Sequence, residues 1–253
     1  RGPGRRRPLV VLFCALLGCT RADVTPAAPE PKPVACVADW TAVASGIEYK
    51  TLNCTPSRFD LHLVRVDPNI APIDAVVRPG STATDLGREY TFALNANFFD
   101  ENYRPLGVVV TSGKVSNPLH PVSWQSVFFI DDDNTPRIVP MEEFKKVGKS
   151  ATAAAQCGPR LVVDGEKNKV ARAEPAWRSG VCIDPRKRVI FFATPPETAL
   201  DVHEMVDLAA GPMGCRDAML FDGGPSTQMY LKRAGEPVVV EGDKRVPAYV
   251  VVK

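Results

Sequence analysis

Short apolar runs, each closed by glycine, proline, asparagine or aspartate, restrict this chain to a sheet-rich fold. Runs of this length are typical of strands, because a helix in a globular protein needs a longer periodic segment. The run FDLHLVRVD (59–67) alternates, so that Phe59, Leu61 and Leu63 share one face. The other predicted strands lie at 91–95, 106–110, from Lys114 onward, 126–130, 136–139, 159–163, 181–183, 188–194, 217–221, 228–231 and 237–240.

One amphipathic helix is predicted within TALDVHEMVDLAAGP (198–212). Thr198 and Asp201 have the spacing of a capping box, apolar residues follow at helical intervals, and a glycine and a proline end the segment. Weaker helices are predicted at 85–90 and 141–147. We therefore expect one α+β domain, dominated by mixed or antiparallel β-sheet with a few helices, whose strand-end loops form one cleft.

The N-terminal segment has the pattern of an export signal. A basic start precedes an apolar run from Leu9 to Leu17, which is too short to span a bilayer as a helix and fits a signal peptide at 1–18. The ending LLGC resembles a bacterial lipoprotein processing box, in which Cys19 becomes the lipidated N-terminus. The alternative is a plain signal peptide cut after Ala22. The proline- and alanine-rich stretch 19–34 is then an extended tether.

Export places the remaining cysteines of the predicted domain, 35–253, in an oxidising compartment. Cys36 and Cys54 form the first predicted disulfide, because that bond would staple the start of the domain. The other cysteines of the domain are Cys157, Cys182 and Cys215, and at most two of these three can pair with each other. We thus expect a periplasmic or cell-surface protein that meets a membrane only through its lipid anchor.

Charge and motifs exclude several classes of function. The net charge is +2, and much of the excess lies in the arginines of the first seven residues, so the body shows no basic stripe for nucleic acid. The sequence contains no P-loop and no GxSxG nucleophile elbow. It has three histidines, and none has a spacing that marks a catalytic triad.

Polar residues gather where three of the predicted strands begin or end. Asn95 and Asn97 lie in NANFFD (95–100), where asparagine is disfavoured in a strand, so they either stabilise a turn or supply amides to a ligand. Arg160 precedes a buried run that turns at Asp164-Gly165, and Arg178 precedes the run at 181–183. Arg160 either is paired structurally or faces a pocket. Arg178 either is a solvated loop arginine or faces a pocket.

The stretch MLFDGGPSTQMY (219–230) carries the fourth and most informative cluster. A buried strand ends on Asp222, and Gly223 and Gly224 then let the backbone approach a ligand and expose its amide N–H groups. Ser226 and Thr227 add hydroxyl groups. A carboxylate beside such a set of donors suits a sugar or a phosphate, although a purely structural turn remains the alternative.

These clusters together resemble the phosphodiester glycosidase family. The shared motifs run in the order NxxFF, GVVxxxGKV, GPRLVxDG, RxGxxID, a helix and AMLFDGGPSTQM, and cover about 39–253. LFDGGPST and GPRLVVDG are the most specific of them. The sequence departs from the family pattern at Cys182 and at the alanine of NANFF, where glycine is more common; neither position is a candidate acid or base.

The resemblance implies an exported hydrolase that cleaves the bond between a sugar's anomeric carbon and phosphate in a sugar-1-phosphodiester of a phosphorylated glycan. Asp222 is then the nucleophile or general base, and Asp164 a weaker second carboxylate. Arg160 and Arg178 clamp the phosphate. The remaining predicted contacts to sugar hydroxyls or phosphate oxygens come from Asn95, Asn97, Gly223, Gly224, Ser226 and Thr227.

Three questions stay open from the sequence. No cofactor is required, but a divalent cation such as calcium could offset the repulsion between Asp222 and a phosphate. A non-catalytic envelope lipoprotein that binds phosphorylated glycans would keep the same arginines and glycines without needing a water-activating carboxylate. An ester hydrolase that uses Ser226 as its nucleophile is the third possibility.

Overall fold

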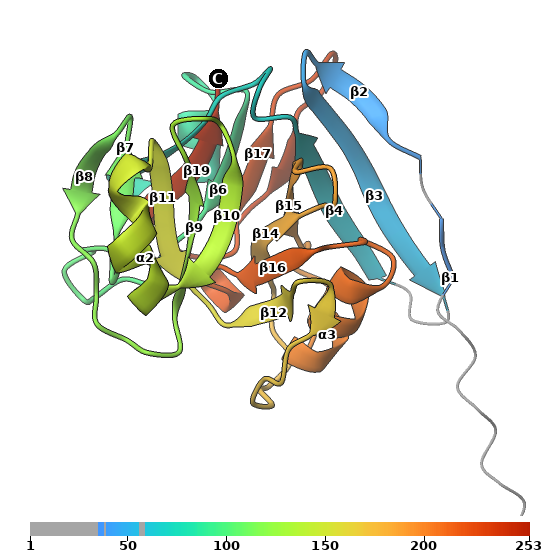
Figure 1. The fold of residues 1–253 in the computed structure, drawn as a ribbon. Coiled ribbons are helices and arrows are strands. Elements are labelled where there is room, and N and C mark those ends of the chain that lie inside the picture. Colours follow the sequence, from blue (N-terminus) through green and yellow to red (C-terminus); the bar gives the residue numbers. More distant parts are fainter. Residues whose placement is uncertain (1–34, 38, 56–58) are drawn as a thin grey trace, which may run out of the picture. The chain divides into compact units, whose positions relative to one another are not determined.

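The computed structural model describes residues 35–37, 39–55 and 59–253 (Figure 1). The predicted signal peptide, the lipidation site Cys19 and the tether at 19–34 lie outside the described residues, so they stay predictions. None of the helices within these ranges is long and apolar enough to cross a membrane.

The described chain forms three antiparallel sheets. The largest has nine strands in the order β1-β3-β4-β15-β14-β16-β12-β13, with β2 also paired to β3. Its strands are β1 (Ala35–Val37), β2 (Thr41–Ala44), β3 (Ile47–Thr55), β4 (Phe59–Val66), β12 (Arg160–Val163), β13 (Glu166–Lys167), β14 (Ser179–Ile183), β15 (Val189–Ala193) and β16 (Asp217–Leu220). All of these pairings are antiparallel.

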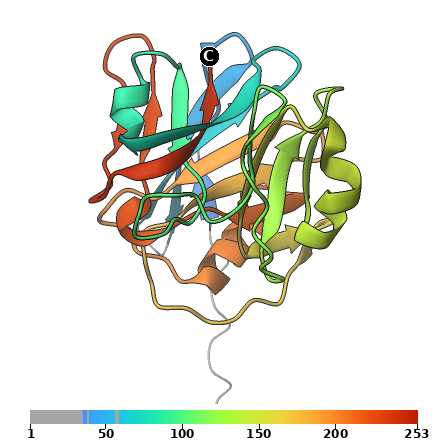
Figure 2. The same ribbon diagram turned by 90° about the vertical axis from the view of Figure 1, so that its left-hand side faces the viewer.

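The two smaller sheets have five strands each, in the orders β10-β9-β11-β7-β8 and β18-β17-β6-β19-β5. Figure 2 shows them side by side in the upper part of the molecule, one in green and one in teal and red. Their strands are β5 (Ile73–Ser81), β6 (Phe92–Asn95), β7 (Val109–Thr111), β8 (Lys114–Asn117), β9 (Ser126–Ile130), β10 (Pro136–Pro140), β11 (Ala153–Cys157), β17 (Met229–Leu231), β18 (Val238–Val240) and β19 (Val246–Val252).

Both faces of the large sheet are buried, which explains the nearly continuous apolar runs of its central strands. In β4, Leu61 and Leu63 share a buried face, as predicted; they pack in the cluster that includes α3 (Val202–Ala210). The opposite face, which a half-exposed strand would leave to water, is equally buried at Val64 and Val66. These two valines join a central core to which all three sheets contribute.

Each small sheet carries a helix on the face turned away from this core. α1 (Ala83–Leu86) covers the sheet that contains β19, and α2 (Met141–Val147) covers the sheet that contains β9. Short 3-10 turns, η1 (Gly148–Ser150) and η2 (Gly224–Ser226), complete the elements. The predicted fold class, α+β with mainly antiparallel sheet, is thereby confirmed.

Two helix starts differ from the prediction. The capping box of α3 joins Asp201 to Glu204, not Thr198 to Asp201. The reason is tertiary: Leu200 exchanges backbone hydrogen bonds with Ala176, which keeps it extended and delays the helix. The helix expected at 85–90 lies instead at Ala83–Leu86, with a capping box from Thr82.

The cysteines divide into a disulfide, a buried thiol and a pair whose side chains are not described. Cys182 of β14 is bonded to Cys215, just before β16, and Cys157 is free and buried. The strand register sets Cys36 directly opposite Cys54. Since their side chains lie outside the described residues, the disulfide between them stays a prediction.

Candidate active site

Three hydrogen bonds from two sheets fix the backbone of Asp222, two residues beyond the end of β16. Its N–H donates to the carbonyl of Ala96 at 2.9 Å. Its carbonyl accepts from Asn95 Nδ2 at 2.6 Å and from Ser179 Oγ at 3.0 Å. Asp222 therefore stands at a fixed junction between the large sheet and the extension of β6.

Gly223 has to be glycine because the chain passes close to a neighbouring strand extension. A Cβ at this position would lie 2.8 Å from the carbonyl oxygen of Trp177, and 3.7 Å from Arg178 NH1. Gly224 has φ +57°, a left-handed backbone that opens the η2 turn. Gly223 thus brings the backbone close to Arg178 without a side chain in between. The expectation that both glycines expose their amides is wrong, because the Gly224 N–H donates to the Trp177 carbonyl at 2.8 Å and the Gly223 N–H donates to the Asp222 carboxylate.

The carboxyl group of Asp222 is held in a low-polarity environment. Burial raises its pKa to about 6, although hydrogen bonds from Ser226 and from the Gly223 N–H, and the charge of Lys244, act in the opposite direction. The buried thiol of Cys157 is close enough that the charge of Asp222 helps to raise the thiol pKa, after burial itself. Asp222 remains partly exposed, so a small molecule can reach it.

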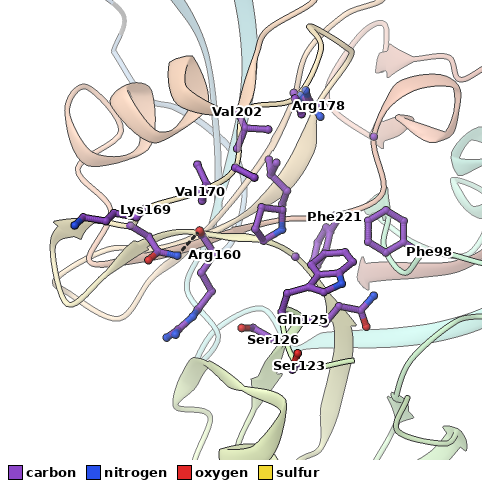
Figure 3. Close-up of a pocket in the computed structure, with 18 of the residues that line it drawn as sticks. Phe98, Ser123, Gln125, Ser126, Arg160, Lys169, Val170, Arg178, Val202 and Phe221 are labelled. Atoms are coloured by element: carbon purple, nitrogen blue, oxygen red, sulfur yellow. Dashed lines mark hydrogen bonds between the residues drawn. The ribbon is translucent and has the colours of Figure 1, made fainter. Parts of the chain in front are cut away.

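A pocket of about 550 Å³ opens next to Asp222 in the chain, although Asp222 itself is not among the residues that line it. Phe221 and Gly223, the residues on either side of Asp222, belong to its lining (Figure 3). The lining contains no aspartate or glutamate, but it contains four basic side chains: Arg160, Lys169, Arg172 and Arg178. A pocket of this composition favours an anionic ligand.

None of these four basic groups forms an ion pair within the described residues. Arg178 is half-buried and donates only to neutral partners, from Nε to the Leu200 carbonyl at 2.9 Å and from NH2 to the Glu174 carbonyl at 2.7 Å. Burial lowers the pKa of its guanidinium, and Asp201 raises it slightly back. A guanidinium held this way keeps its charge available for a ligand.

The two arginines predicted to clamp one phosphate lie at opposite ends of the pocket. Figure 3 shows Arg178 at one end and the guanidinium of Arg160 at the other, with Val202 and Val170 between them. The strand register agrees. β12 and β14 flank β16, so the positions of Arg160 and Arg178 are two strand spacings apart, and they are also offset by about three residues along the strands. Together these separations correspond to about 14 Å between Cα atoms.

Asp164 lies at the far end of β16 from Asp222. It is exposed in a turn, its carboxylate accepts from Arg216 at 3.0 Å, and its N–H donates to Asp217 at 3.1 Å. Five residues of extended chain separate Asp217 from Asp222, roughly 16 Å. Paired carboxylates in glycosidases stand about 5–9.5 Å apart, so the structure does not bring Asp164 to the same sugar carbon.

The predicted asparagine and hydroxyl groups do not line the pocket, and of them only Asn95 and Ser226 contact Asp222. Asn95 uses its amide to brace the backbone of Asp222 and its oxygen to accept from the Gln228 N–H at 3.1 Å, so it is a positioning residue. Asn97 donates to the Val108 carbonyl. The buried Asn97 Oδ1 and Thr227 Oγ1 have no hydrogen-bond partner among the described residues.

Sequence reasoning missed the residues that build the opposite wall of the pocket. Gln156, fully buried in β11, donates to Gln125 Oε1 and the His120 carbonyl, and accepts from the His120 N–H. It thereby anchors the loop that presents Trp124, whose ring meets Phe98 edge-on at 5.8 Å. A glutamine inside the apolar run AAAQC is the one signal that could have pointed to this role.

The other catalytic arrangements receive little support from the geometry. Ser226 bonds to Asp222 and not to a histidine; His62 bonds to Tyr49, and His203 to the Val170 carbonyl. Among the described residues, no three His, Cys, Asp or Glu side chains gather in a way that could hold a metal ion.

Comparisons with known proteins bear on the family and the fold of this chain. A model of the phosphodiester glycosidase family matches residues 88–253. YigE, an uncharacterised protein of Escherichia coli strain K12, is 26% identical over 156 residues, which are 57% of this chain and 59% of that protein. The chain thus spans less than two thirds of the length of this curated relative.

Two solved structures share the fold. The catalytic domain of zebrafish N-acetylglucosamine-1-phosphodiester alpha-N-acetylglucosaminidase, auto-inhibited by its pro-peptide, has a TM-score of 0.62 at 15% identity, covering 83% of each chain. A hypothetical protein from Synechocystis has a TM-score of 0.60 at 15% identity, covering 87% of this chain and 67% of that one. Because the family model matches more than half of its length, the chain belongs to the phosphodiester glycosidase family.

Proposed function

We propose that this protein is an exported hydrolase that cleaves the bond between the anomeric carbon of a sugar and the phosphate of a sugar-1-phosphodiester in a phosphorylated glycan. The observation that carries the proposal is one pairing: a carboxyl group with a pKa of about 6 beside a pocket lined by four basic side chains and no acidic one. The family provides the reaction class.

The leaving group explains why one carboxylate is sufficient. In this reaction the C1–O bond breaks, the phosphate monoester leaves with the electron pair, and water supplies the hydroxyl group that ends on C1. A phosphate monoester has a second pKa near 6 and departs without a general acid. The usual demand for two carboxylates therefore falls, and the demand for phosphate recognition rises.

Asp222 acts as the nucleophile or as the base that takes the proton from water. Its pKa of about 6 keeps it ionised at neutral pH while making it more basic than an ordinary aspartate. Asn95 and Ser179 hold its backbone, and the Ser226 hydroxyl orients its carboxylate.

Substrate contacts fall to the groups nearest this carboxylate. Arg178 binds the scissile phosphate. The Cys182–Cys215 disulfide supports an oxidising, extracytoplasmic location, in agreement with the predicted export signal and with anchoring through Cys19.

The test is hydrolysis of a panel of methyl phosphodiesters of N-acetylglucosamine, glucose, galactose and mannose 1-phosphates, in both anomers. Free sugar and methyl phosphate are the expected products, detected by chromatography and mass spectrometry. In ¹⁸O-labelled water, the label enters the sugar if the C1–O bond breaks and enters the phosphate if the P–O bond breaks. Label in the phosphate would contradict the proposal.

Asp222→Asn should reduce kcat/KM about 10³-fold, the size expected for loss of a positioned base or nucleophile. Asp217→Asn is the matched control, because Asp217 begins β16, the strand that leads to Asp222, is partly buried and also has a raised pKa. It should stay within a few-fold of the wild type. If binding of the diesters persists in the wild type with no turnover, the protein is the non-catalytic glycan-binding lipoprotein instead.

A further inference from the structure

The positive charge of the pocket exceeds what one phosphodiester can neutralise. A phosphodiester carries a single negative charge, whereas four basic side chains line the pocket without an acidic partner in its lining. Basic groups placed together repel each other, and an anion that lies among them relieves this repulsion. The excess charge calls for a ligand with more than one anionic group.

The arginines lie far enough apart to form two separate anion-binding sites in the pocket. Arg178 lies beside Gly223 at the Asp222 end of the pocket. Arg160 lies about 14 Å away at Cα level, and Val170 and Val202 stand between the two side chains in Figure 3. Lys169 is on the same side as Arg160, with its ammonium group directed outward.

The segment that carries Lys169 is fixed and is not a loose loop. Asn168 donates from its backbone N–H to the Leu161 carbonyl at 2.9 Å and from Nδ2 to the Arg160 carbonyl at 2.9 Å. His203 Nε2 meets the Val170 carbonyl at 3.2 Å. These contacts hold the Lys169 backbone next to Arg160 on the outer rim of the pocket.

Beyond Arg160 the surface is mixed in charge and has no excess of basic groups. Arg160 also borders a second pocket of about 420 Å³, whose lining contains acidic residues in addition to basic ones. The acidic residues are Glu143, Asp164, Asp184 and Asp217. An anionic ligand that enters from Asp222 therefore gains attraction up to Arg160 and loses it past that point. Arg160 marks the end of the anion-binding surface.

We propose that the natural substrate carries a second phosphate on the group beyond the scissile phosphodiester, separated from it by a short spacer, and that Arg160 and Lys169 bind this second phosphate. The inference rests on the proposed function and adds the class of substrate: a sugar-1-phosphodiester of a phosphorylated alcohol, either as a free molecule or as the end of a phosphate-repeat polymer.

Three synthetic diesters of one sugar test the proposal. In the first the aglycone is methanol, in the second it is glycerol 3-phosphate, and in the third the two phosphates are adjacent in a diphosphate. At fixed ionic strength, the glycerol phosphate diester should be preferred about tenfold in kcat/KM, mainly through KM. The diphosphate should gain less, because adjacent phosphates cannot span Arg178 and Arg160. A short oligomer of the glycerol phosphate repeat, compared with the single unit, separates the polymeric source from the free one.

Arg160→Gln should remove most of this preference, and Lys169→Gln should remove a smaller part because the Lys169 ammonium group is directed outward. Both should leave hydrolysis of the methyl diester nearly unchanged. Lys167→Gln is the matched control: Lys167 lies two residues from Lys169, but it is ion-paired with Asp207 at 2.8 Å and does not line the pocket. Equal kcat/KM for the methyl and glycerol phosphate diesters would overturn the inference, as would an equal loss on both diesters in Arg160→Gln. A larger gain in kcat/KM for the diphosphate than for the glycerol phosphate diester would contradict the proposed spacer between the two phosphates.

Failure of this inference can be told apart from failure of the proposed function. Calorimetric titration of Asp222→Asn with the same diesters measures binding without turnover. Tighter binding of the glycerol phosphate diester, abolished by Arg160→Gln, supports the second phosphate site even if the wild type cleaves nothing. If the wild type cleaves all three diesters and the variant binds them with equal affinity, the proposed function stands and the second phosphate site is rejected.

Discussion

The two ends of β16 present carboxylates in opposite circumstances. At one end, Asp164 and Asp217 meet Arg216 in a mixed-charge pocket, and Asp164 is exposed and ion-paired. At the other end, Asp222 is mostly buried, no salt bridge holds it within the described residues, and burial raises its pKa to about 6. The same residue type becomes structural at one end and reactive at the other, because solvation and partners differ.

The largest effect on stability should come from removing the disulfide near the Asp217 end of β16, and this change should not alter catalysis. The Cys182–Cys215 disulfide closes a loop with a sequence separation of 33 residues next to that end. Replacing both cysteines by alanine should lower the free energy of unfolding by about 3–4 kcal/mol, from the chain entropy of a loop of this length. Urea denaturation measures the change. The folded variant should keep its kcat/KM; a large loss would mean that the two ends of β16 are coupled.

Asp222→Asn should make the protein more stable at neutral pH. The folded-state pKa of about 6 lies above the ordinary 3.8, so the native protein binds more protons between these values and loses stability as pH rises from about 4 to 6. Removing the charge should recover at most about 3 kcal/mol above pH 6 and almost nothing below pH 4. Denaturation curves at both pH values test this; Asp217→Asn should show a smaller gain in the same direction.

Arg178→Gln should cost about 100-fold in kcat/KM, or about 2.7 kcal/mol, because a charged donor to the scissile phosphate is lost. Arg178→Lys should recover part of the rate, since it restores the charge without the planar fork. Arg186, which is exposed and outside the pocket, provides the control as Arg186→Gln. Equal losses in the two glutamine variants would remove Arg178 from the proposed site.

The smallest effect is the pH dependence of the wild type. If Asp222 works ionised, kcat/KM should fall about tenfold, or 1.4 kcal/mol, for each pH unit below about 6, since the phosphodiester itself does not titrate there. Stopped assays from pH 4 to 8 at constant ionic strength give the profile. A rate that rises toward pH 4 would assign Asp222 the role of an acid and reverse the proposed mechanism.

Local patterns were sufficient for most strands and for two of the helices. The predicted helix at 141–147 is observed as Met141–Val147, and the long helix is observed one turn inside its predicted segment. β5 and β19 were not predicted. Each contains a proline, a residue that normally argues against a strand. Pro247 is tolerated where the register of β19 shifts, and Pro79 lies in β5, which is an edge strand.

The residues of the candidate site also divide into those that local sequence patterns predicted and those that they did not. Three residues of the pocket lining could be named from the sequence: Arg160, Arg178 and Gly223. A strand does not require an arginine or two glycines at its end, so their presence beside an apolar run indicates another role. Lys169, Arg172 and Trp124 could not be named in this way, because they belong to irregular segments with no periodicity to mark them. The sequence predicts a substrate contact for Asn95, yet its side chain turns inward and holds the backbone of Asp222.

The sequence alone determined the sheet-rich α+β class and the family, because both follow from short-range patterns: apolar runs, turn residues and contiguous motifs. The tertiary structure decided which carboxylate is reactive and which cations share a pocket. These properties depend on burial and on distances across strands that are remote along the chain, and no local pattern encodes them. Asp164 and Asp222 each adjoin a glycine in nearly the same short motif, and only the folded chain places one in solvent and the other beside the pocket.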